Sequence, residues 1–110
     1  MTTQQIASMI DSIGLPNAYY SYPVGEAPDV PYILFYYPNS QDFFADNQNY
    51  QAKSQLNIEV YTAEKDFEIE RKVEKALREK GLTWQKEEAY ITEENMFECL
   101  YVTEVFITNG

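Results

Sequence analysis

A chain of 110 residues suits one domain with a modest hydrophobic core, and we expect a single domain over residues 1–110. Its formal net charge of −10 opposes binding to nucleic-acid backbones and to anionic membranes, because both require clustered Lys and Arg. With no His and only Cys99, an intramolecular disulfide and a Cys/His metal site are excluded, which fits assembly in the cytoplasm. We see neither a secretion signal nor an apolar run of about 20 residues, and we expect no membrane contact.

The N-terminal segment predicts a short helix. Thr2 and Gln5 have the spacing of a capping box. The apolar residues that follow have helical spacing: Ile6, Met9, Ile10 and Ile13. Gly14 supplies a left-handed residue that closes a helix at about Ile13, and Pro16 prevents its continuation. The apolar stripe docks either on the protein's own sheet or on a neighbouring subunit; we favour its own sheet, because so short a helix is marginal alone.

Two strands and a long polar segment come next. Residues 18–22 predict a short strand that ends at Pro23, and residues 32–37 predict a second strand that is apolar on both faces. That second strand is therefore either central or covered on both sides. Residues 39–50 are polar but include Phe43, Phe44 and Tyr50, and the segment is long for a loop. The two Phe residues either close one end of the core or anchor a partner.

A strand over residues 56–61 is followed by a helix that begins at Thr62 or Asp66 and ends at Lys80. Leu56, Ile58 and Val60 alternate with polar residues, so one face of the strand is buried. The helix has one apolar stripe: Ile69, Val73, Ala76 and Leu77. Gly81 after this stripe predicts a Schellman ending in which Leu77 contacts Leu82. Phe67 is out of phase with the stripe, so it packs only in the first turn or faces another chain.

The charges are unevenly distributed. Residues 63–88 hold eight acids and seven of the eight bases, whereas the rest of the chain holds ten acids and Lys53. The helix is therefore predicted to have a charge-mixed solvated surface with two i,i+4 ion pairs, Glu68–Lys72 and Glu74–Arg78. The strands and loops carry the net negative charge.

Two strands end the chain. Residues 83–90 predict a solvated edge strand, residues 92–95 a polar connection, and residues 96–107 the longest strand. One face of this last strand is apolar apart from Thr103. Its other face is mixed: Met96, Glu98, Leu100, Val102, Glu104 and Phe106. Such a face is covered either by a neighbouring subunit or in part by the N-terminal helix.

The element order αβββαββ predicts a two-layer α+β fold. Its sheet has four to five mostly antiparallel strands, with the long helix across one face.

Side chains for catalysis are not brought together by any pattern in the sequence. The acid pairs Glu87–Glu88 and Glu93–Glu94 lie in or beside a hairpin, where neighbouring residues point to opposite faces. Cys99 lies mid-strand with no candidate base, so we expect a buried, inert thiol. The glycines are isolated, and EF-hand spacing is absent. We therefore expect no enzyme, no cofactor and no metal.

Several short stretches resemble small tail-terminator or tail-completion (neck) proteins of long-tailed phages and prophages of Gram-positive bacteria. The stretches, spread over roughly residues 32–107, are residues 43–47 with Tyr50, 56–62 with Lys65–Asp66, 81–84, 90–91 with Glu94, 96–97 and Tyr101. Their motifs are structural and not catalytic.

The resemblance implies a homo-oligomeric ring, typically a hexamer, that caps the tail tube, stops polymerisation of the tube protein and docks to the head connector. Such a protein is assembled in the bacterial cytoplasm and ends in the virion, where DNA passes through its negative lumen as cargo. We expect subunit contacts at the following residues: Phe43, Phe44, Tyr50, Phe67, Leu100, Val102 and Phe106. Three alternatives remain: another head–tail joining protein, an acidic DNA-mimic inhibitor of a host nuclease, and a small immunity or adaptor protein.

Overall fold

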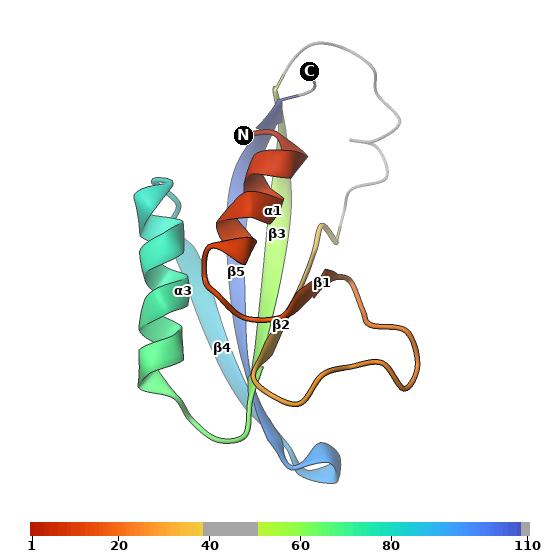
Figure 1. Cartoon of the computed structure of the whole chain (residues 1–110). Helices are drawn as coiled ribbons and strands as arrows, with labels where there is room; N and C mark the ends of the chain where they lie inside the picture. Colours follow the sequence, from red (N-terminus) through yellow and green to blue (C-terminus); the bar gives the residue numbers. More distant parts are fainter. Residues whose placement is uncertain (39–50, 109–110) are drawn as a thin grey trace.

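The computed structural model describes residues 1–38 and 51–108. It has the predicted α+β fold, in the predicted order of helix, three strands, helix and two strands (Figure 1). The elements are α1 (Thr3–Asp11), β1 (Asn17–Tyr19), β2 (Tyr32–Tyr36), β3 (Gln51–Thr62), α3 (Phe67–Glu79), β4 (Trp84–Ile91) and β5 (Met96–Thr108), with a 3-10 turn at Thr92–Glu94. No helix among these residues combines the length and the hydrophobicity that a membrane span needs.

The five strands form one sheet in the order β1-β2-β3-β5-β4. Every neighbouring pair is antiparallel except β1 and β2, which are parallel. The sheet is organised by its two longest strands, β3 and β5, which pair over twelve positions from Gln51 with Thr108 to Thr62 with Phe97. The expectations of a mostly antiparallel sheet and of an edge position for β4 are confirmed.

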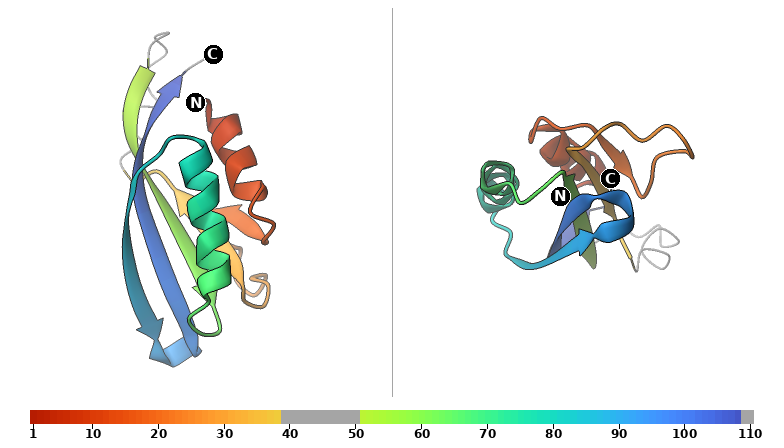
Figure 2. Two further views of the ribbon diagram at one scale, coloured as in Figure 1. Left: turned by 90° about the vertical axis from the view of Figure 1, so that its left-hand side faces the viewer. Right: turned by 90° about the horizontal axis from the view of Figure 1, so that it is seen from below.

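Both helices lie on the same side of the sheet (Figure 2), so the domain has two layers. The core between them combines the α1 stripe, the α3 stripe and alternate residues of the central strands. Its fully buried members include Ile6, Ile10, Ile33, Leu56, Ile58, Leu77, Tyr101 and Ile107. The prediction that α1 docks on its own sheet is confirmed. The alternative in which α1 partly covers the mixed face of β5 is wrong, because α1 packs on the opposite side.

The helix ends agree with their local sequence signals. The Thr2 hydroxyl accepts from the Gln5 N–H at 3.1 Å while the Gln5 side chain accepts from the Thr2 N–H at 2.8 Å, which completes the capping box. At the end of α3 the Leu82 N–H donates to the Leu77 carbonyl at 3.0 Å, around Gly81 with φ of +72°. This is the predicted Schellman ending, and the left-handed backbone at that position favours glycine.

Three predicted boundaries differ from the structure by two residues or more, and the other boundaries agree within about one residue. The strand expected over residues 18–22 ends at Tyr19, because Tyr20 takes a φ of +71° and turns the chain out of the sheet. Strand β3 begins at Gln51, five residues before the predicted start, because β5 extends to Thr108 and provides pairing partners for it. Helix α1 ends at Asp11, two residues before the predicted end at Ile13.

Candidate interaction surface

The side of the sheet that faces away from both helices is the candidate site, and we call it the open face. The register of the strands assigns alternate residues of β2, β3, β5 and β4 to this side. They include Tyr32, Leu34, Tyr36, Lys53, Gln55, Asn57, Glu59, Tyr61, Gln85, Glu87, Ala89, Ile91, Met96, Glu98, Leu100, Val102, Glu104 and Phe106. Among the described residues, no helix lies on this side (Figure 2).

Tyrosine rings form a cluster at the β2 side of the open face. The ring of Tyr61 stacks on that of Tyr32 with centroids 5.1 Å apart, and Tyr32 makes an edge contact with Tyr22 at 5.6 Å. Tyr20 makes a similar edge contact with Tyr36 at 5.4 Å. The loop after β1 therefore returns to the sheet through aromatic contacts, which contribute about 0.5–1.5 kcal/mol each beyond the area they bury.

Two carboxylates lie beside these rings. The Tyr61 hydroxyl lies 2.8 Å from Glu59 Oε1 and 3.1 Å from Glu98 Oε2. Tyr36 adds a hydroxyl 3.1 Å from the other oxygen of Glu59, and it accepts from the Asn57 amide at 3.2 Å. A hydroxyl has one proton to donate, so Tyr61 satisfies only one of its two carboxylates at any moment. The carboxylates of Glu59 and Glu98 therefore have more acceptor positions than the neighbouring hydroxyl groups can fill.

Burial is the main cause of the pKa shifts of Glu98 and Tyr61. Burial raises the pKa of Glu98, and the charges of Glu59 and Glu87 act in the same direction against the hydrogen bond from Tyr61. Burial also raises the pKa of Tyr61, and its hydrogen bond to Glu59 adds to that effect. The Tyr61 hydroxyl therefore stays protonated and acts as a hydrogen-bond donor, whereas ionisation of Glu98 is less favourable in the folded protein than in water.

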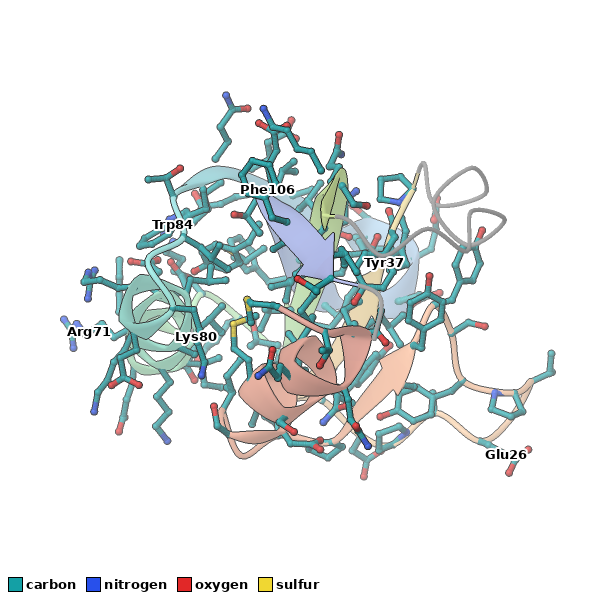
Figure 3. The ribbon with its side chains drawn as sticks, turned by 90° about the horizontal axis from the view of Figure 1, so that it is seen from above. Glu26, Tyr37, Arg71, Lys80, Trp84 and Phe106 are labelled. Carbon is teal, nitrogen blue, oxygen red and sulfur yellow. The ribbon has the colours of Figure 1, made fainter. Side chains whose placement is uncertain are left out.

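The rest of the open face is partly apolar. Leu34, Leu100 and Val102 are half-buried, and Phe106 is 56% exposed and points away from α1 (Figure 3). Three predicted contact residues, Leu100, Val102 and Phe106, therefore lie together on one face.

The remaining predicted contact residues lie elsewhere. Phe67 is 63% exposed at the start of α3, on the helix side of the sheet, with Lys65 Nζ 4.8 Å from its ring centroid. The structure does not bring Phe67 together with the residues of the open face. Phe43, Phe44 and Tyr50 lie outside the described residues.

A second charged cluster lies between α3 and β4, on the helix side of the sheet. Glu70, only 5% exposed, accepts from Lys86 at 2.7 Å and from Lys65 at 2.9 Å. Lys86 also pairs with Glu74 at 3.0 Å, and Lys65 pairs with Glu88. The buried hydroxyl of Tyr101 donates to Glu74 at 2.8 Å. We call this set the ionic cluster.

The predicted helical ion pairs Glu68–Lys72 and Glu74–Arg78 are wrong. Within the described residues the ion pair inside α3 is Lys75–Glu79, at 3.9 Å. Glu74 instead reaches Lys86 on β4, and Arg78 lies over the ring of Trp84, 5.7 Å from its centroid. The pair Glu74–Arg78 does not form because Glu74 faces β4 and Arg78 packs against Trp84.

The ionic cluster is a poor metal centre. Ligand atoms of Glu70, Glu88 and Cys99 lie within 4.8 Å of one another. However, the carboxylates already accept from the ammonium groups of Lys65 and Lys86, which a cation would have to displace. Burial opposes the charge on Glu70, but the hydrogen bonds from Lys86 and Lys65 outweigh it and lower its pKa. Burial raises the pKa of the Cys99 thiol, which is 2% exposed and so is the buried thiol that we expected.

One hollow on the described surface has no converging set of reactive groups. This hollow, of about 560 Å³, runs between α1 and the end of α3 and is lined mainly by neutral polar side chains, with Glu79 and Lys80 at one end. The acid pair Glu87–Glu88 points to opposite faces as predicted, because Glu87 pairs with Leu100 and Glu88 with Cys99.

Sequence reasoning placed the β5 residues of the open face together, including Glu98 and Glu104, but missed Glu59 and the tyrosines beside them. The alternation of Asn57, Glu59 and Tyr61 places all three on the open face, and Glu98 is on the mixed face of β5. The signal was therefore present. The alternation did not give the register between the strands, and it is this register that places Tyr61 directly opposite Glu98.

The chain matches no protein-family model, no curated protein and no solved structure.

Proposed function

We propose that this protein is a non-catalytic assembly subunit of the tail-terminator type. Its copies form a ring, with six as the expected number, that caps a tail tube and docks to the head connector of a long-tailed phage. The proposal rests on the resemblance of its sequence stretches and on one observation, the open face. That face combines Leu100, Val102 and the exposed Phe106 with carboxylates and tyrosines, the mixture of apolar and polar groups that interfaces use.

The arrangement of charge favours assembly over nuclease inhibition by DNA mimicry. A phosphate mimic needs carboxylates in a continuous row. On the open face the acids Glu59, Glu98 and Glu104 are interleaved with Leu100 and Val102, and Lys53 pairs with Glu104 at 3.4 Å. Carboxylates interrupted by apolar side chains in this way fit a protein partner better than they imitate the regular phosphates of DNA.

A lumen for DNA requires acids outside the subunit contacts. Glu26 and Asp29, in the loop between β1 and β2, and Glu93 and Glu94, at the β4–β5 turn, are exposed carboxylates on the periphery of the subunit. In a ring of such subunits these groups would repel phosphates, so that DNA passes without binding. The finished ring belongs to the neck or tail of the virion.

The test is assembly with and without tube protein. Wild-type protein is expected to form rings visible by negative stain, either free or on tube ends, and to fix tube length when co-assembled. Phe106→Glu is expected to abolish both. Val24→Glu replaces another exposed apolar residue away from the sheet and is the matched control. A Phe106→Glu protein that still forms rings and still limits tube length contradicts assembly through the open face.

A further inference from the structure

The exposed side of α3 is basic in a strongly acidic chain. Its exposed bases outnumber the two exposed acids, Glu68 and Glu79. They are Arg71, Lys72, Lys75, Arg78 and the capping Lys80. The cause is the ionic cluster: Glu70 and Glu74 turn toward β4 and are neutralised there by lysines. Arg71 extends away from the ribbon in Figure 3 and makes no ion pair among the described residues.

The open face carries the opposite charge. It holds four carboxylates, Glu59, Glu87, Glu98 and Glu104, and within the described residues its single base is Lys53. The pair Glu59–Glu98 shares one hydroxyl proton from Tyr61 and so can accept further hydrogen bonds. A guanidinium group supplies several donors in a planar fork and also stacks on aromatic rings. The tyrosine cluster beside the two carboxylates provides such rings.

We propose that the exposed side of α3 of one copy docks on the open face of the next copy, with Arg71 placed at the Glu59–Glu98 pair. This inference rests on the proposed ring function and names its subunit contact. The occupant is a second copy because both complementary surfaces are present on this chain. The two surfaces lie on opposite sides of the sheet (Figure 2), so the contact is head-to-tail and generates a ring when its rotation closes.

The dimensions and the apolar groups agree with this contact. A helix of 13 residues is about 20 Å long and strands of 12 or 13 residues are about 40 Å long, so α3 fits along the paired β3 and β5. Phe67 lies about 6 Å along the helix from Arg71, so it would then meet the open face near Leu100 or Val102. The contact accounts for why the predicted interface residues divide between the two sides of one subunit.

Charge reversal with rescue is the main experiment. Two double variants are made: Arg71→Glu/Lys75→Glu on α3, and Glu59→Lys/Glu98→Lys on the open face. Each alone is expected to weaken self-association at least about tenfold in sedimentation velocity, with far-UV circular dichroism unchanged. Their equimolar mixture is expected to assemble, because each variant then meets an opposite charge on both of its surfaces. Two variants that each assemble like wild type, or a mixture that stays dissociated, would overturn the inference.

Disulfide cross-linking can detect this contact even if it is too weak to be seen by sedimentation velocity. Protein carrying Arg71→Cys is mixed with protein carrying Glu98→Cys in a glutathione redox buffer. This pair is expected to cross-link at least about tenfold faster than the control pair of Val24→Cys with Glu98→Cys. Faster cross-linking of Glu98→Cys with itself than with Arg71→Cys would show an open-face-to-open-face dimer and reject the proposal.

The two proposals fail in different ways. Rings that form in the wild type and persist in both charge-reversed variants leave the ring function intact and remove this contact. Wild-type protein that assembles neither alone nor on tube ends removes both.

Discussion

The carboxylates on the two faces of the sheet have different kinds of partners. On the helix side, Glu70 is nearly fully buried and accepts from two lysines, and Glu74 accepts from Lys86 and Tyr101. On the open face, Glu59 and Glu98 have the hydroxyl groups of Tyr61 and Tyr36 as their partners, and no lysine or arginine lies within ion-pair distance among the described residues. One cluster is complete within the subunit, whereas the other still lacks cations.

This difference separates what holds the subunit together from what it offers to a partner. A buried charge that loses its counter-ion is costly, so the ionic cluster fastens α3 to β4. Carboxylates at a half-exposed surface are solvated and cost the isolated subunit little. The same residue type therefore contributes to folding on one face and to association on the other.

Removing Glu70 is expected to give the largest difference in stability between the two faces. Glu70→Ala is expected to lower the free energy of unfolding by about 2 kcal/mol, because it removes the carboxylate shared by Lys86 and Lys65, although each lysine keeps a second acceptor. Glu59→Ala, the matched change on the open face, is expected to cost less than about 1 kcal/mol. Urea unfolding followed by circular dichroism measures both. Equal losses in the two variants would show that both clusters are structural.

A pair of tyrosine variants tests the hydroxyl groups. Tyr101→Phe is expected to cost about 1 kcal/mol, because the hydroxyl of a fully buried residue donates to Glu74. Tyr61→Phe is expected to cost less, because water can reach the half-buried carboxylates that lose this donor. Thermal melts of the two variants measure both losses of stability. A larger loss for Tyr61→Phe than for Tyr101→Phe would contradict the prediction.

The fold was largely readable from the sequence because its signals are local. Period-two alternation marked β3 and β5, and the Thr2–Gln5 box and Gly81 marked the ends of helices. The end of β1 was missed because a left-handed Tyr20 has no sequence signal comparable to that of glycine.

The candidate surface was only half readable, for a different reason. Alternation assigned Leu100, Val102 and Phe106 to one face, but the partners of charged side chains depend on which strands are neighbours. Glu74 therefore looked like the partner of Arg78, its neighbour on the helix, although it binds Lys86 twelve residues away on β4. Because Glu70 and Glu74 on α3 turn toward β4, the outer side of the helix is basic. The nearly equal numbers of acids and bases in residues 63–88 gave no sign of this separation.

The smallest effect is expected for Glu98, and it is measured by comparing the pH dependence of Glu98 with that of Glu70, because the pKa values of the two groups shift in opposite directions. The lowered pKa of Glu70 means that its contribution to stability is present above the ordinary value of 4.5 and is lost as the pH falls through its folded value. The raised pKa of Glu98 means that its ionisation destabilises the fold at neutral pH, and that this penalty disappears as the pH falls through its folded value.

Glu98→Gln should therefore be more stable than wild type at pH 7, by less than about 1 kcal/mol because the site is half-exposed. The gap should close on acidification and vanish below the ordinary carboxyl pKa of 4.5. For Glu70→Gln the wild type should be the more stable protein at pH 7, and its advantage should shrink only at lower pH. Urea unfolding of both variants from pH 3 to pH 7 gives the two curves. A Glu98→Gln variant that is less stable than wild type at pH 7 would mean that the open-face carboxylates are already satisfied within the subunit, and the case for a cationic partner would lose its electrostatic basis.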